Sequence, residues 1–140
     1  PDASPFAPVG DPDTLALGTG AMAFEPVARG QVLTLHRGCQ GAQHVWLSLR
    51  LPQASPGEWA LAAALLDADD APLTPVFRLA DEPWQAAPGG GAQIVGLTLV
   101  VFDPTLVVDQ PVRLWAQVNG PDGAVSAVEA VTVAWGADAC

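Results

Sequence analysis

Leu-His-Arg-Gly-Cys-Gln-Gly-Ala-Gln-His-Val-Trp-Leu-Ser-Leu-Arg-Leu, residues 35–51, contains both histidines and the clearest β pattern of the chain. Its second half alternates two sets of side chains: Val45, Leu47, Leu49 and Leu51 against His44, Trp46, Ser48 and Arg50. A period of two places each set on its own face of a strand. Gly38 and Gly41 favour a turn before that strand, and Gln31–His36 has the pattern of another one. We therefore expect a hairpin-like unit with both histidines near its bend.

The rest of the chain continues as short alternating segments between turns. Alternation is clear in Gln93–Phe102 and Val112–Asn119, and residues 119–123 (Asn-Gly-Pro-Asp-Gly) are a strong turn signal. The segment Trp59–Leu66 is rich in alanine and leucine, which also favour helix, but its alternation and bounding turns favour a strand. We expect an all-β fold, a two-sheet antiparallel sandwich of about seven to eight strands, with Trp135 facing its core.

This arrangement is similar to bacterial extracellular immunoglobulin-like domains. Three segments, Leu17–Gly20, Phe24–Pro26 and Gly38–Val45, also resemble an uncharacterised group of secreted proteins from GC-rich bacteria. The likeness covers roughly the first third of the domain. It implies an immunoglobulin-like sandwich and an exported protein, and it brings no assigned chemistry.

Proline spacing divides the chain into two parts. Residues 1–13 contain four prolines and three aspartates, which predicts an extended leader or linker. Residues 14–140 are expected to form a single β-sandwich domain, a length that can bury a real core.

The charge balance excludes two classes of partner. The chain has 15 acidic residues against 5 basic ones, all arginine, giving a net charge of −10. Binding to nucleic acid or to an anionic lipid surface relies on basic side chains, so neither is expected. No run approaches the ~20 apolar residues of a membrane-spanning helix. A lipid anchor on a longer parent chain stays open.

Two cysteines allow one disulfide, Cys39–Cys140. It would close a loop of about 100 residues, for which the chain-entropy model gives roughly 4–5 kcal/mol. A disulfide predicts a periplasmic, cell-surface or secreted location. The alternatives are two free thiols, or Cys39 as a metal ligand.

The second interpretation of Cys39 is a copper or zinc site with His36, His44 and Met22. A thiolate, two imidazoles and a thioether suit copper, and cupredoxins hold such a set on a β-sandwich. The resemblance is partial, because cupredoxins cluster their cysteine, histidine and methionine late in the chain. A variant with only His36, His44 and a carboxylate is compatible with the disulfide. The structural alternative is that both histidines only stabilise the turn.

Alternation also places Trp46 and Trp115, with Arg50 and Arg113, opposite the aliphatic sets. We treat these four residues as a candidate interaction surface. Exposed tryptophans can stack on sugar rings, whereas the other interpretation is a second buried layer.

Two further chemistries find little support. The acidic turn Asp67–Asp70 could offer oxygens to calcium, but its spacing is not that of an EF-hand and calcium is not expected. No Gly-x-Ser-x-Gly motif or phosphate-binding loop occurs, so we expect no enzyme.

Alanine-rich strand faces favour close packing against another protein. The alanines of these strand faces are Ala60, Ala62, Ala64, Ala116, Ala130 and Ala134. We therefore expect an exported, non-catalytic structural or protein-interaction module, a subunit of a cell-surface or extracellular assembly that binds other subunits or itself, without a cofactor. The alternative is a periplasmic or secreted protein that binds copper or zinc through His36 and His44.

Overall fold

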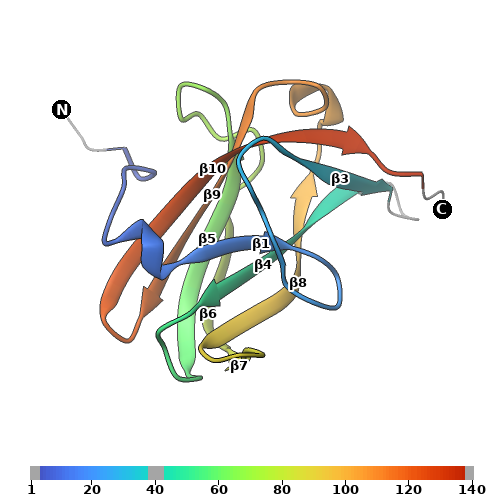
Figure 1. Ribbon diagram of the computed structural model, residues 1–140. Coiled ribbons are helices and arrows are strands. Elements are labelled where there is room, and N and C mark those ends of the chain that lie inside the picture. The colour runs from blue at the N-terminus through green and yellow to red at the C-terminus, as the bar shows by residue number, and fades with distance from the viewer. Residues whose placement is uncertain (1–3, 38–42, 138–140) are drawn as a thin grey trace.

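The structure is a computed structural model that describes residues 4–37 and 43–137 (Figure 1). Within these residues the elements are η1 (Pro12–Thr14), β1 (Ala16–Thr19), β2 (Glu25–Pro26), β3 (Gln31–Arg37), β4 (Gln43–Leu51), β5 (Glu58–Leu66), β6 (Phe77–Pro83), β7 (Gln85–Ala86), β8 (Ala92–Val101), η2 (Pro104–Leu106), β9 (Val112–Gly120) and β10 (Gly123–Trp135). The two η elements are short 3₁₀ helices. The expected all-β class is confirmed.

The strands form one curled, mixed sheet with the shape of a half-barrel. Its main path runs β2-β1-β4-β3-β10-β9-β5-β6, and β8 pairs with β4 and with β7. Strand β3 links the two halves, because it pairs antiparallel with the start of β4 and parallel with the end of β10. The expectation of purely antiparallel pairing is therefore wrong, and separation into two immunoglobulin-like sheets is not confirmed.

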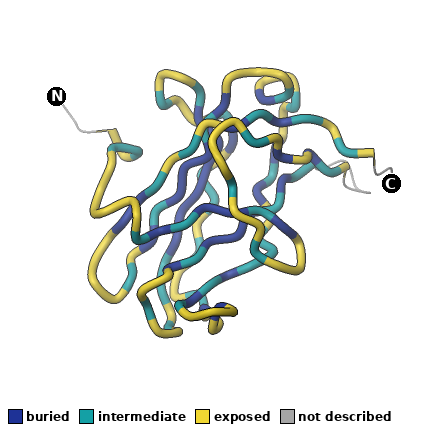
Figure 2. The backbone as a smooth tube through the Cα atoms, viewed as in Figure 1, coloured by how far each residue is buried: buried dark blue, intermediate teal, exposed yellow. Residues whose placement is uncertain are grey.

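The core lies inside this curl, where the buried stretches of the strands gather (Figure 2). Its largest fully buried side chains are Leu33, Leu35, Val45, Leu47, Leu49, Leu65, Leu99, Val101, Val107, Leu114 and Val118. The alternation in residues 45–51 is confirmed, since all four aliphatic residues of that set are buried. Removal of this apolar surface from water is the main force that closes the sheet.

The Ala/Leu-rich segment is a strand, as expected. Leu61, Ala63 and Leu65 of β5 face the main core, while Ala62 and Ala64 belong to a smaller cluster on the outer face. Strand β5 pairs with β9 on one side and with β6 on the other. A strand is favoured because it buries Leu61, Ala63 and Leu65 in the main core and pairs both of its edges, and these tertiary contacts outweigh the local helix preference of alanine and leucine.

The turn at residues 119–123 is confirmed as the β9–β10 hairpin, where Gly120 pairs with Gly123. At the other end of β10 the inward expectation for Trp135 is wrong, because its side chain is 37% exposed. Strand β9 accompanies β10 only as far as Val131, so Trp135 lies at the rim, where the Arg37 guanidinium sits 3.9 Å from its ring centroid.

The N-terminal segment packs on the sheet before entering it. Val9 makes two hydrogen bonds with Ser126 of β10: Ser126 N donates to Val9 O, and Val9 N donates to the side-chain Oγ of Ser126. Upstream, Phe6 contacts the outer cluster. Among the described residues, no helix is both long and apolar enough to cross a membrane.

Candidate functional site

The two histidines lie directly opposite each other on β3 and β4. His36 and His44 are register partners, their ring centroids are 5.5 Å apart, and the rings stack at 27°. Trp46, two residues along β4, meets the His44 ring edge-to-face at 4.7 Å. The expected hairpin-like unit thus brings both histidines together, a geometry compatible with two imidazole ligands of one metal ion.

The rest of the candidate metal set is not assembled around this pair. Met22 is 93% exposed in the connection between β1 and β2, so its side chain extends into solvent. Cys39 lies outside the described residues. Across residues 4–37 and 43–137, no group of three or more histidine, cysteine, aspartate or glutamate side chains could hold a metal ion.

A depression of about 340 Å³ lies beside His36 and Trp46, lined also by Thr19, Gln31 and Thr34. It exists because β3 and β1 pair with different ends of β4 and leave the edge of β4 near Trp46 without a strand. Thr19 Oγ1 donates a hydrogen bond of 2.7 Å to the Trp46 carbonyl and closes part of this edge.

The four residues of the candidate interaction surface have different surroundings. Trp115 is only 3% exposed, and Phe6 packs edge-to-face on it at 4.8 Å. This agrees with the second interpretation of Trp115, a buried layer: alternation places it on the outer face, and a segment distant in sequence covers it there. Arg113 forms an ion pair with Asp70 beside it.

The other two residues of that surface remain partly exposed. Trp46 packs against the histidines, and Arg50 donates to Gln93 Oε1 at 2.7 Å while its guanidinium lies 4.3 Å from the Phe24 ring centroid. Trp46 and Arg50 thus belong to the half of the sheet opposite to Trp115, and the four do not form one surface.

The acidic turn stabilises itself. The Asp67 carboxylate accepts hydrogen bonds from Asp69 N at 2.8 Å and Ala71 N at 3.0 Å, and Asp70 binds Arg113. The carboxylates of Asp67 and Asp70 therefore stabilise the turn between β5 and β6.

Cys39 and Cys140 both lie outside the described residues, so the disulfide stays a prediction. The described segments next to them are neighbours: Gly136 N donates to Leu35 O at 2.9 Å, and Arg37 packs on Trp135.

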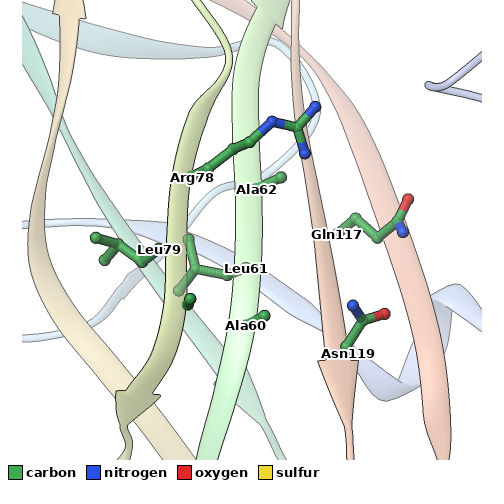
Figure 3. A pocket seen from close by; sticks show the side chains of 8 residues that line it. Ala60, Leu61, Ala62, Arg78, Leu79, Gln117 and Asn119 are labelled. Carbon is green, nitrogen blue, oxygen red and sulfur yellow. The ribbon is translucent and has the colours of Figure 1, made fainter.

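A further site lies on the outer face of β5, β6 and β9 (Figure 3). We call it the outer trough, an open hollow of about 360 Å³ lined by Ala60, Leu61, Ala62, Arg78, Leu79, Ala80, Gln117 and Asn119. Register places Arg78, Ala62 and Gln117 in one row across the three strands, and Ala60 beside Asn119 in the next. Small alanines form the floor between longer polar side chains.

Comparison with known proteins finds no matching family model, no similar curated protein and no similar solved structure.

Sequence reasoning found the alanine face of the outer trough but missed its polar walls. Ala60 and Ala62 alternate visibly with inward residues. Arg78 comes from a strand whose register with β5 contains a bulge between Trp59 and Leu61, so its position was not readable from either segment. The outward position of Gln117 and Asn119 could have been predicted, because they alternate in step with Trp115.

Proposed function

We propose that this chain is an exported, non-catalytic protein-interaction module that binds another protein through the outer trough. The observation that supports this is the composition of the trough. In a chain with a net charge of −10, its lining contains one arginine, two carboxamides and no acidic residue. A neutral floor that accepts close approach, with polar groups at its borders, suits a protein segment.

The same proposal includes the role of a subunit in a cell-surface or extracellular assembly. The curled sheet encloses its core and leaves the outer trough on β5, β6 and β9 open to a partner subunit. Oxidation of Cys39 and Cys140 would agree with an extracellular location.

A random peptide display library tests the proposal. Wild type and two variants, Ala60→Trp and Ala130→Trp, are used as bait. Ala60 lies in the trough, whereas Ala130 is an exposed outward residue of β10 and serves as a matched control. We expect peptides to be enriched on wild type and on Ala130→Trp and lost on Ala60→Trp. No enrichment, or equal enrichment on all three, would contradict the proposal. Circular dichroism establishes that both variants fold.

The second candidate function is copper or zinc binding, favoured by the opposed rings of His36 and His44. Metal analysis of native protein, with a thiol assay on the unfolded chain, separates the candidates. Stoichiometric copper or zinc that is lost in His44→Ala supports a metal site. Protein without metal and without a free thiol supports the interaction module.

A further inference from the structure

Arg78 differs from three other arginines of the chain in what surrounds its guanidinium. Arg113 is paired with Asp70, Arg50 lies between Gln93 and Phe24, and Arg37 covers Trp135. Arg78 extends from β6 across β5 beside Ala62, toward the side where Gln117 and Asn119 lie (Figure 3). Within residues 4–37 and 43–137, no ion pair involves it.

We propose that the outer trough binds a carboxylate side chain on a segment of a partner protein, with Arg78 as the anchoring cation. This inference rests on the proposed function and names the chemistry of its partner. A guanidinium presents a rigid fork of donors that matches a carboxylate in two parallel hydrogen bonds. The amide groups of Gln117 and Asn119 add donors across the alanine floor.

Charge complementarity supports an acidic partner segment. The trough has one positive side chain and no negative one, although acidic residues outnumber arginines three to one in the chain, 15 against 5. An acidic segment would be repelled by most of this surface and would find a cation here. Repulsion of an acidic segment by the rest of the surface would therefore direct it to the trough and would favour this position over others.

The adjoining part of the same face already binds a chain segment through one side chain. Ala62 belongs both to the trough and to the outer cluster with Ala64 and Trp115, which the N-terminal segment covers through Phe6. That segment turns at Phe6, where Ala7 N donates a hydrogen bond to Ser4 O. The trough is thus the uncovered continuation of an outer face that already accepts a segment with one anchoring side chain.

The test uses a peptide enriched on wild type in the display experiment, labelled for fluorescence polarisation, and its version with each acidic residue replaced by the amide. Arg78→Gln is compared with Arg29→Gln, a matched control because Arg29 is exposed in the turn before β3 and is not part of the trough. We expect Arg78→Gln and the amide peptide each to weaken binding about tenfold or more, as for loss of a charge-assisted pair. Together they should weaken it little further, since both remove the same interaction.

The outcomes separate this inference from the proposed function. Peptides that bind the trough but lack acidic residues, or that bind Arg78→Gln as tightly as wild type, overturn the carboxylate and leave the interaction module standing. Additive effects of the two changes also overturn it. Failure of every peptide to bind overturns both proposals.

Discussion

Phe6 and Trp115 show what a single side chain contributes from outside the main core. Phe6 closes the outer cluster of Ala62, Ala64 and Leu66 over the Trp115 ring. Edge-to-face aromatic pairs contribute roughly 0.5–1.5 kcal/mol beyond the area they bury. We expect Phe6→Ala to lower the free energy of unfolding by about 1–2 kcal/mol, measured by urea denaturation.

The control for that substitution is Phe102→Ala. Phe102 is 72% exposed, so its removal should change stability by less than about 0.5 kcal/mol. Equal effects of the two changes would show that Phe6 does not cover Trp115 in solution.

Gly96 is a second residue at which a single added atom, the Cβ of alanine, should change the stability of the protein. Its φ is +78°, and a Cβ added there would lie 2.6 Å from the Ala21 carbonyl oxygen. Its N–H donates to Ser48 Oγ, which donates to the Gly20 carbonyl. We expect Gly96→Ala to cost roughly 2–4 kcal/mol in a thermal or urea unfolding experiment, because left-handed strain and a backbone clash add.

Gly89→Ala separates these two causes. Gly89 also has a positive φ, +85°, but no atom lies within 4 Å of its added Cβ. The free energy of unfolding of this variant should fall by only about 1–2 kcal/mol, the cost of left-handed strain alone. A Gly96→Ala variant no less stable than Gly89→Ala would contradict the close approach of the β1–β2 connection to β8.

At the scale of elements, the parallel pairing of β3 with β10 joins the two halves of the sheet. The pairing covers Gln31–Leu35 against Val131–Trp135 and ends at the Arg37–Trp135 contact. The predicted Cys39–Cys140 disulfide would begin just beyond that contact. It would therefore tie together the chain just beyond the ends of the β3–β10 pairing.

We expect the unfolded, unreduced protein to contain no thiol that reacts with Ellman's reagent. We also expect the double variant Cys39→Ser, Cys140→Ser to lose about 2–5 kcal/mol of stability. Wild-type protein measured after reduction is the control, and it should match the double variant. Two reactive thiols in native preparations would rule out the disulfide and return Cys39 to the metal interpretation.

At the scale of the whole molecule, the net charge of −10 opposes the folded state. Its 15 acidic side chains repel one another more strongly in the compact chain than in the unfolded one. Salt screens this repulsion over about 10 Å at 0.1 M. We expect the melting temperature to rise between low and physiological NaCl, measured by calorimetry. KCl at the same ionic strength should act alike, and a fall in melting temperature would contradict net repulsion.

The sequence predicted much of this architecture at the level of single strands. Alternation located β4, β8 and β9 to within a residue or two, and it identified β5 despite its helix-favouring composition. The sequence also predicted that His36 and His44 lie near one bend, and the two residues are register partners. The sequence left open whether Trp115 is exposed or covered, because parity states which face a side chain takes and not what covers that face.

The outer trough was predictable only as a row of alanines. Its cation comes from β6, and the row Arg78, Ala62, Gln117 exists only once β6, β5 and β9 are in register. The bulge in the β5–β6 pairing shifts that register by an amount that neither strand encodes alone.

The sequence by itself determined that the chain is built of strands, which side chains of β4, β5 and β9 face inward, and that the molecule carries an excess of negative charge. Those properties follow from neighbours a few residues apart and from composition. Only the tertiary structure decided that β3 runs parallel to β10, that Phe6 covers Trp115, and that Arg78 lies beside the alanines of β5. Each of these joins segments far apart in the chain, and burial of the shared core fixes them together rather than any local pattern.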